Sequence, residues 1–426
     1  MSVPRHDPLA ALRQPGFALY AAGRLAGATA MTMFNAVILY HVYELTASPF
    51  QLAFIGLARF LPSLGLTLVG GALADSANRR LIVLAAQVVP AGASLALLSA
   101  TASGTVGTPL IYALVLAVAV AAAFENPARQ ALLPQVVTPE AFPNAIVVTS
   151  TVQSLGFVTG PAAGGLLIGL VGLEAAYAAH AALVGVAIIA VLLLRPRPVE
   201  LAPRVVSLAG IREGIRFVLQ RQVLIGAMTL DMFAVIFGGA QALLPIYATD
   251  ILGVGGLGYG ILAASLEAGA LAMSVALVFL PPIRQAGRAL LSAVALFGLG
   301  TIAFGLSRNF YLSVATYAFI GMADQVSVVL RQAAVQLSTP DELRGRVSSV
   351  NMLFIGASNQ LGAVESGLVA GLTSATFAVV SGGVGTLAVV AIVAARLPGL
   401  RNYRIEPRVS EPARSPAPAG HGTLPS

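Results

Sequence analysis

The chain has 426 residues, of which 57% are hydrophobic and only 10% are charged, and its formal net charge is +7. Soluble domains carry about 25% charged residues, so this composition excludes a soluble enzyme. The mean hydropathy of +0.88 reflects long apolar runs, such as 81–98 and 176–194. Each run approaches the roughly 20 apolar residues that a helix needs to cross a bilayer.

Cysteine and histidine usage limits the chemistry that the chain can carry. It contains no cysteine, and none of its four histidines lies in an HExxH pattern. Disulfides and thiolate metal sites are therefore excluded, and we expect neither a metal nor a cofactor. The first sixteen residues are polar, so we expect no cleavable signal peptide and a first membrane helix that directs insertion itself.

Apolar stretches between helix breakers predict an all-α integral membrane protein with twelve membrane helices. The fourth is predicted to be short, and the first and fifth are long enough to tilt or to extend past the bilayer. The predicted spans are 17–43, 51–74, 81–101, 109–124, 143–171, 175–194, 223–248, 257–280, 289–307, 310–331, 347–371 and 376–396.

The distribution of positive charge predicts the orientation. All 24 basic residues are arginines. Arg308 falls in an outside loop and Arg24 and Arg59 fall within helices, which leaves 21 of the 24 inside if the N-terminus is cytoplasmic. The positive-inside rule then predicts a multi-pass protein of the inner (plasma) membrane with both termini in the cytoplasm. Arginines placed between membrane spans also argue against nucleic acid as a partner.

The longest interior loop, 195–222, joins two sets of six predicted helices. Within it, Leu208, Ile211, Ile215 and Leu219 recur at helical spacing, with arginines and a glutamine on the opposite face. This pattern predicts an amphipathic helix on the cytoplasmic surface. A plain solvated linker helix is the alternative.

The two halves of the chain repeat each other. Arg129-Gln-Ala recurs as Arg331-Gln-Ala at an offset of 202 residues, and the Thr-Pro-Glu after it recurs as Thr-Pro-Asp at an offset of 201. A repeat of six helices keeps its orientation, so we predict two six-helix bundles related by a pseudo-twofold axis along the membrane normal, with a binding site between them. The predicted domains are a cytoplasmic N-terminal segment (1–16), an N-terminal bundle (17–194), the linker (195–222), a C-terminal bundle (223–397) and a disordered cytoplasmic tail (398–426).

A charged loop follows the second predicted helix. It reads Gly71-Ala-Leu-Ala-Asp75-Ser-Ala-Asn78-Arg79-Arg80. This resembles the hallmark loop of the major facilitator superfamily, Gly-x-x-x-Asp-x-x-x-Arg-Arg, which often has glycine where Asn78 stands. The resemblance implies a cytoplasmic gate in which Asp75 contacts the start of the eleventh helix, a contact favoured by about 0.3–1 kcal/mol. We expect Gly71 to permit a close helix contact; the alternative is a charged turn that satisfies the positive-inside bias.

The fifth predicted helix carries a glycine and proline pattern. It reads Gly156-Phe-Val-Thr-Gly160-Pro161-Ala-Ala-Gly164-Gly165. The pattern resembles GxxxGPxxGG, which within the superfamily marks exporters that work as antiporters. Glycines on neighbouring turns allow helix backbones to approach closely, and Pro161 removes one helical hydrogen bond and permits bending. Ordinary packing of small residues is the alternative.

Four further phrases resemble one branch of the superfamily, the enterobactin-exporter and macrolide-efflux branch. They begin at Tyr43 (Tyr-Glu-Leu-Thr-Ala-Ser), Phe60 (Phe-Leu-Pro-Ser), Pro127 (Pro-Ala-Arg-Gln-Ala-Leu-Leu-Pro) and Leu343 (Leu-Arg-Gly-Arg-Val-Ser-Ser). The resemblance covers about 12–397 and implies export of a small amphipathic molecule. One departure is that the fourth predicted helix lacks the arginine that many proton-coupled drug exporters carry there.

Ionisable residues inside membrane helices cost a few kcal/mol and are functional candidates by default. Glu267 is predicted to lie nearest the midplane, and it forms with Asp231 and Asp324 the set of proton-coupling candidates. The alternative for Glu267 is a protonated carboxyl bonded to a neighbouring helix. The alternative for Asp324 is a structural ion pair with a nearby arginine.

Two arginines and several aromatic residues are candidates for the substrate cavity. We expect Arg59 or Arg24 to bind an acidic group of the substrate or to tune the carboxylates, although Arg24 can also snorkel to the cytoplasmic surface. Phe34, Phe233 and Phe237 are expected to line an amphipathic cavity, and lipid-facing packing is their alternative.

Together these features predict a monomeric secondary transporter that exports a drug or siderophore in exchange for protons by alternating access. Its expected partners are a small-molecule substrate, protons and the lipid bilayer. The alternatives are an importer or lysophospholipid flippase on the same fold, and a membrane-embedded enzyme. No Walker motif is present, so nucleotide hydrolysis is not expected to drive it.

Overall fold

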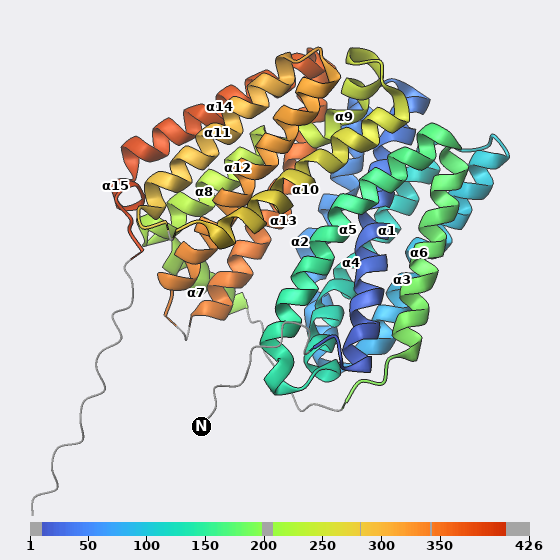
Figure 1. The fold of residues 1–426 in the computed structure, drawn as a ribbon, viewed down its shortest axis with the longest axis horizontal. Helices are drawn as coiled ribbons and strands as arrows, with labels where there is room; N and C mark the ends of the chain where they lie inside the picture. The colour runs from blue at the N-terminus through green and yellow to red at the C-terminus, as the bar shows by residue number, and fades with distance from the viewer. Residues whose placement is uncertain (1–10, 198–207, 282, 341–342, 406–426) are drawn as a thin grey trace, which may run out of the picture.

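The computed structural model describes 11–197, 208–281, 283–340 and 343–405, and these residues form only helices and their connections (Figure 1). The first part of the chain contains six long helices. They are α1 (Pro15–Thr46), α2 (Pro49–Ser76), α3 (Arg79–Ala102), α4 (Thr108–Val136), the 3₁₀ turn η1 (Pro139–Ala141), α5 (Phe142–Leu170) and α6 (Leu173–Leu193).

The second part begins with a short helix and continues with seven further helical segments. They are α7 (Leu208–Leu219), α8 (Gln222–Phe237) with its continuations η2 (Ala240–Leu243), α9 (Leu244–Ile246) and η3 (Tyr247–Ile251), then α10 (Gly255–Phe279), α11 (Ala286–Leu306), α12 (Phe310–Leu337), α13 (Arg344–Leu372), α14 (Ala375–Arg396) and α15 (Pro398–Arg401).

Ten of these described segments are long and apolar enough to cross a membrane. The predicted all-helical class is therefore confirmed. The two further long helices, α2 and α13, pack against each other and lie among the ten. Local sequence explains several helix starts: proline occupies the first turn of α1, α2 and α4, and the side chains of Asn78, Asn309 and Ser374 accept hydrogen bonds from the first backbone amides of α3, α12 and α14.

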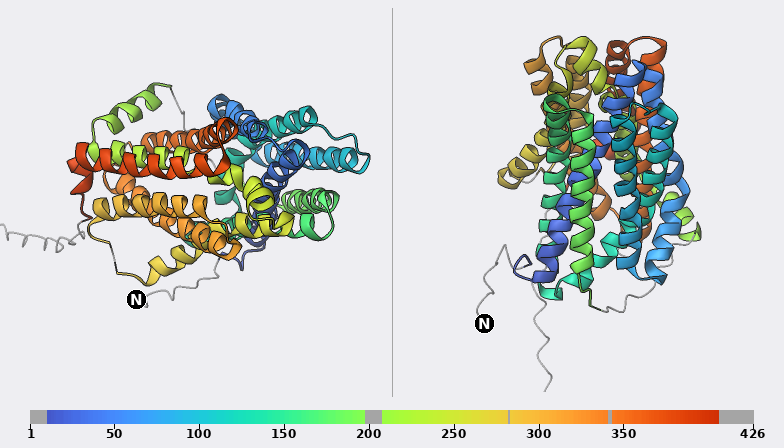
Figure 2. Two further views of the ribbon diagram at one scale, coloured as in Figure 1. Left: turned by 90° about the horizontal axis from the view of Figure 1, so that it is seen from above. Right: turned by 90° about the vertical axis from the view of Figure 1, so that its right-hand side faces the viewer.

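The helices pack as two sets. α1 packs on α5 and α6, and α4 packs on α2 and α3. In the second set α12 packs on α10 and α11, and α14 packs on α11 and α8. The sets touch mainly where α5 meets α10 and where α2 meets α13. They lie side by side when viewed from above (Figure 2), and in Figure 1 they converge at the end where α9 lies and diverge toward the end where α7 lies.

The fourth helix is not short, as the sequence had suggested. α4 continues through Pro127 and Pro134 to Val136. The charged stretch that follows the predicted span 109–124 is buried in the first set, where Arg129 is 3% exposed and forms an ion pair with Glu125 one turn earlier. Burial of the paired arginine explains why polar sequence continues a membrane helix here.

The seventh predicted helix is not continuous. α8 ends at Phe237, and Gly238 and Gly239 lead into a 3₁₀ turn and then a π-helical turn. A Cβ atom added to Gly239 would lie 2.6 Å from the carbonyl oxygen of Gly362 on α13. The break therefore lets the backbone of this segment approach α13, and broken membrane helices are tolerated where protein surrounds them.

The amphipathic linker helix forms α7. Gly214 and Val218 pack on Val347 and Val350 of α13, and Glu213 forms an ion pair with Arg346. On the other side, Leu219 is 61% exposed. α7 thus packs on the start of α13 with one face and leaves apolar side chains uncovered on another.

The predicted N-terminal segment and linker lie partly outside the described residues, and the predicted tail is described only to Ile405. That first portion of the tail is ordered, contrary to expectation. Leu400 of α15 is 1% exposed and packs on Gly226 and Gly287, and the Gly287 amide donates to the Tyr403 carbonyl oxygen at 3.1 Å. The apolar Leu400 and these backbone bonds explain the order.

α10 and α12 are in direct backbone contact. A Cβ atom added to Gly321 would lie 1.9 Å from the carbonyl oxygen of Leu266, and one added to Gly269 would lie 2.0 Å from that of Ala318. Glycine therefore sets the distance between the two helices, as in other membrane interfaces built from small residues.

We expect Gly321→Ala to lower the free energy of unfolding by about 1–3 kcal/mol, because the added methyl group forces α10 and α12 apart. Thermal unfolding in detergent micelles measures this. Gly92→Ala on α3 is the matched control, since a Cβ atom there meets nothing within 4 Å. Equal melting temperatures for the two variants would contradict the packing described.

Candidate functional site

A cavity of about 420 Å³ lies between the two helix sets. Its walls come from α1, α2 and α5 of the first set and from α8, η2, α9, α10, α11, α12 and α13 of the second. Apolar side chains alternate with polar ones, so the cavity suits an amphipathic molecule. The polar lining consists of Thr32, Asn35, Arg59, Gln241, Tyr259, Glu267, Thr301, Tyr317, Asp324, Asn359 and Gln360.

At one end of the cavity the two sets are in backbone contact through glycines. A Cβ atom added to Gly165 of α5 would lie 2.2 Å from the Cα atom of Gly260 on α10. At the crossing of α13 with α2, a Cβ atom added to Gly367 would lie 2.8 Å from the backbone nitrogen of Ala53. Only glycine permits these approaches, so the sequence fixes where the sets meet.

The glycines of the fifth-helix pattern divide between two faces. Gly156, Gly160 and Gly164 lie against α1, where a Cβ atom on Gly160 would be 2.6 Å from the Thr29 carbonyl oxygen. Gly165 lies against α10 of the other set. Pro161 is part of the cavity lining. The pattern therefore joins helices within the first set and also across to the second.

Two hydrogen bonds cross between the sets near the same end. The Tyr259 hydroxyl on α10 donates to the Ala36 carbonyl oxygen on α1 at 2.9 Å. The Tyr43 hydroxyl at the end of α1 donates to the Asp250 carboxylate in η3. With the glycine contacts, these bonds hold the sets together at the end where α1 meets α2.

Two of the three predicted coupling carboxylates line the cavity. Glu267 extends from α10 and Asp324 from α12, and the two lie within electrostatic range of each other. Neither has a hydrogen bond or an ion pair with any residue that the structure describes. The ion pair considered for Asp324 is thus absent from the described part of the chain.

The third carboxylate, Asp231, has a structural partner instead. Asp231 on α8 lies 3.1 Å from the Arg331 guanidinium on α12, which also donates to the Asn351 side-chain oxygen at 2.9 Å. The two charged side chains are 8% and 3% exposed. Asp231 does not line the cavity, so the arginine ion pair expected for Asp324 belongs to Asp231.

Of the two intramembrane arginines, one lines the cavity and the other does not. Arg59 of α2 lines the cavity. Arg24 of α1 lies outside it and donates to the Gln153 side-chain oxygen on α5 at 2.6 Å. Of the two, Arg59 alone is placed to contact a bound molecule.

The predicted cavity aromatics lie elsewhere. Phe34 is 3% exposed and packs on His180, with ring centroids 5.0 Å apart, and Phe233 and Phe237 stack on each other at 5.9 Å. Phe34 fills the interior of its own helix set, and Phe237 packs on Gly385 of α14. The lining aromatics are Phe157, Tyr259, Phe297 and Tyr317.

A helical-spacing argument could have found two of these aromatics. Tyr259 lies eight residues before Glu267, and Tyr317 lies seven residues before Asp324. Such spacings put both tyrosines on the same helix faces as the carboxylates.

The predicted cytoplasmic gate is only partly described, because the Asp75 side chain lies outside the described atoms. Gly71 does not make the close helix contact expected of it, since a Cβ atom there meets nothing within 4 Å. The preceding Gly70 makes that contact, with the Ala123 carbonyl oxygen of α4. Arg79 donates to the Ala74 carbonyl oxygen and Arg80 to that of Val191 at the end of α6, where a cation is favoured.

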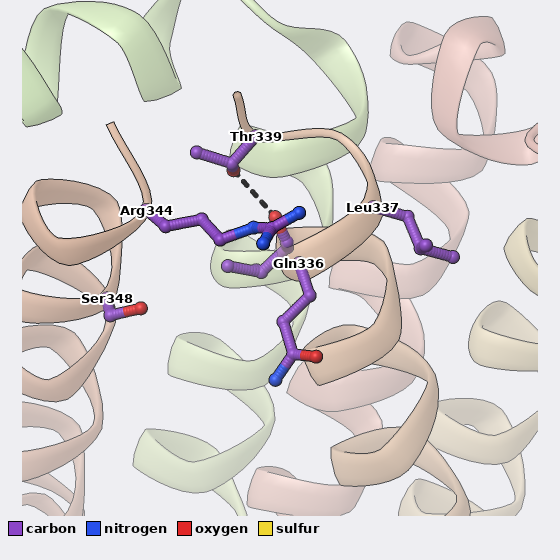
Figure 3. Close-up of a pocket in the computed structure, with 6 residues that line it drawn as sticks. Gln336, Leu337, Thr339, Arg344 and Ser348 are labelled. Atoms are coloured by element: carbon purple, nitrogen blue, oxygen red, sulfur yellow. Dashed lines mark hydrogen bonds between the residues drawn. The ribbon is translucent and has the colours of Figure 1, made fainter. Parts of the chain in front are cut away.

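A second pocket lies at the junction of α12 and α13 (Figure 3). Arg344 extends over it from the start of α13, and the Thr339 hydroxyl donates to the Val335 carbonyl oxygen at 2.6 Å. Gln336, Leu337 and Ser348 complete its lining. None of the predicted site residues contributes to this pocket, so the central cavity is the candidate site.

A polar cavity enclosed between two sets of membrane helices defines the class of protein as a membrane transporter of small molecules. The family described as transmembrane secretion effector matches residues 6–416, nearly the whole chain. The chain therefore belongs to this family, a branch of the major facilitator superfamily. The family and its relatives are transporters rather than enzymes, which confirms the superfamily resemblance and excludes the enzyme alternative.

The chain is similar to efflux proteins over most of its length. It is 28% identical over 386 residues to the multidrug efflux pump Tap of Mycobacterium tuberculosis (strain ATCC 25618 / H37Rv), covering 86% of this chain and 90% of Tap. It is 25% identical over 351 residues to the enterobactin exporter EntS of Escherichia coli O1:K1 / APEC, covering 80% and 82%.

Solved structures share the fold at low identity. The nucleoside transporter NupG superposes with a TM-score of 0.70 at 12% identity, over 89% of this chain and 98% of NupG. A bacterial homolog of the human lysosomal transporter Spinster, in an inward-facing and occupied conformation, gives 0.66 at 15% identity, over 94% and 99%.

The Asp231–Arg331 pair should be structural. We expect Asp231→Ala to destabilise the protein by about 3–5 kcal/mol, because it leaves a buried guanidinium without its partner. Thermal unfolding in detergent micelles measures this, and the double variant Asp231→Leu with Arg331→Met should recover most of the loss. An Asp231→Ala protein that is as stable as the native protein would contradict a structural role.

Proposed function

We propose that the chain is a secondary active exporter of a small amphipathic molecule that works by alternating access. The observation that carries this proposal is the cavity between two helix sets, which are in backbone contact at one end of it. A transporter of this kind binds its substrate between two bundles and rocks them so that the cavity opens to either side in turn.

In this proposal α2 and α13 also cross the membrane, which gives twelve spans in two six-helix bundles related by a pseudo-twofold axis along the membrane normal. The bundles span 17–194 and 223–397, joined by the linker 195–222. The protein lies in the inner (plasma) membrane with both termini in the cytoplasm. It works as a monomer. The arginine distribution supports this orientation.

Protons are the proposed coupling ion, with Glu267 and Asp324 as carriers. Both carboxylates line the cavity and neither forms an ion pair with a described residue, although Arg331 lies within electrostatic range of Asp324. A proton can therefore reach them from whichever side is open. Proton entry down the membrane potential supplies about 2.3 kcal/mol per charge per 100 mV. That free energy can drive a substrate outward without a nucleotide.

Export is the proposed direction. The Gly160-Pro161 pattern and the efflux relatives both favour it over an importer or a lysophospholipid flippase. The names of those relatives make a lipophilic drug or a siderophore the starting point for a substrate search. The cytoplasmic gate of Asp75, Arg79 and Arg80 is proposed to disengage from α13 when the cavity opens to the cytoplasm.

Everted membrane vesicles test the proton coupling. We expect vesicles that contain the protein to accumulate ethidium or dansylglycine when respiration acidifies their interior, and a protonophore to abolish accumulation. Glu267→Gln and Asp324→Asn should each reduce it roughly tenfold, because neither amide can carry a proton. Glu44→Gln, outside the cavity lining, is the matched control. Accumulation that withstands the protonophore and both substitutions would sink proton coupling.

Single-cysteine labelling tests the orientation, and the absence of natural cysteine removes any background. Thr105→Cys, in the exposed connection between α3 and α4, should react with a membrane-impermeant maleimide in intact cells. Gln220→Cys, just after α7, should react only after the cells are permeabilised. The reverse pattern would place the linker outside and overturn the proposed orientation.

A further inference from the structure

Arg59 is held in an unusual electrostatic position. It lies one turn after Gly56, where α2 packs so closely on α13 that a Cβ atom would be 3.0 Å from the Ala363 Cβ and 3.2 Å from the Gln360 carbonyl oxygen. The Arg59 Nη2 atom is buried and has no hydrogen-bond partner among the described residues. The close helix crossing thus fixes a guanidinium at the cavity wall with part of its donor capacity unused.

The charges around Arg59 do not neutralise it. Its electrostatic neighbour is Tyr259 across the cavity, whereas Asp324 interacts with Asp231, Arg331 and Glu267 within the opposite helix set. Neither Glu267 nor Asp324 forms an ion pair with Arg59 in the part of the chain that is described. Arg59 is therefore not placed to tune those carboxylates, which was the alternative role considered for it.

An unpaired buried guanidinium is costly, and the cost falls when an anion occupies the adjoining space. The planar guanidinium fork matches carboxylates and related oxyanions, to which it can donate two parallel hydrogen bonds. The side chains of Asn35, Asn359 and Gln360 line the same cavity and add further donors. Phe157 and Phe297 supply apolar surface for the body of a ligand.

We infer that Arg59 forms an anion subsite and that the transported molecule is an amphipathic organic acid. Its carboxylate, sulfonate or other oxyanion binds the Arg59 guanidinium, and its apolar body lies along the aromatic walls. The inference rests on the proposed function only in taking the central cavity as the substrate chamber. It adds the substrate class, which the proposal for coupling leaves open.

A binding measurement without any proton gradient tests this subsite separately from transport. The chain contains no tryptophan, so Phe157→Trp introduces one reporter in the cavity wall. Energy transfer from this tryptophan to a dansyl group then reports binding to the purified protein in detergent. Dansylglycine and its uncharged amide, dansylglycinamide, have the same apolar body and differ in the carboxylate.

In the Phe157→Trp background we expect dansylglycine to bind about tenfold more tightly than dansylglycinamide, because Arg59 pairs with the carboxylate. Arg59→Gln should bring the two dissociation constants together by weakening the acid alone, and Arg59→Lys should keep part of the preference. Arg24→Gln is the matched control, since this arginine lies outside the cavity, and it should keep the whole preference.

Several results would overturn the anion subsite. They are equal affinities for the acid and the amide in the Arg59-containing protein, no binding of the acid at millimolar concentration, or a preference that persists in Arg59→Gln. If Arg59→Gln does not fold, the anion subsite is still tested by the Arg59→Lys variant and by the ratio of the dissociation constants of the acid and the amide. Glu267→Gln should not lower the preference, so a failure of proton coupling leaves this test intact.

Discussion

The architecture depends on backbone contact between glycines of different helix sets. Gly165 and Gly260 bring α5 and α10 together at a distance that no side chain permits, and Gly367 does the same for α13 on α2. Because apolar side chains are as well solvated by lipid as by protein, close packing of small residues is a main attraction left between membrane helices. Such contacts are made by small, uncharged groups, so they can form and separate without a large desolvation cost.

Charge inside the helices separates into two kinds. Arg331 with Asp231 and Arg129 with Glu125 are buried ion pairs, each within one helix set. Each pair offsets the desolvation cost of its own charges, and the Asp231–Arg331 pair also joins α8 to α12. Arg59, Glu267 and Asp324 instead face the shared cavity without such partners in the described chain. An ionisable group that the fold leaves unpaired in a membrane is the stronger indication of function.

Sequence alone predicted the helical class, the superfamily and Arg59, Glu267 and Asp324 as residues of interest, because hydropathy and intramembrane charge are local properties. Sequence alone did not predict the features that depend on which residues become neighbours in the fold. Asp231 and Asp324 look alike along the chain, and only the packing of α8 against α12 assigns Arg331 to Asp231. The helix break at Gly238 and the rotation of Phe34 toward His180 likewise depend on neighbouring helices. Gly70 and Gly71 are adjacent, so no spacing rule chooses between them.

The position of the cavity charges relative to the helix crossings gives a physical route for coupling. Glu267 lies seven residues, or about 10 Å, along α10 from Gly260 at one crossing, and Arg59 lies one turn along α2 from Gly56 at the other. Both helices are continuous between the charge and the glycine. A change in what binds either charge therefore acts on a rigid segment that also forms a contact between the sets. An occupant that touches Arg59 and the acids together bridges both sets, so its binding must favour some relative arrangements of the sets over others.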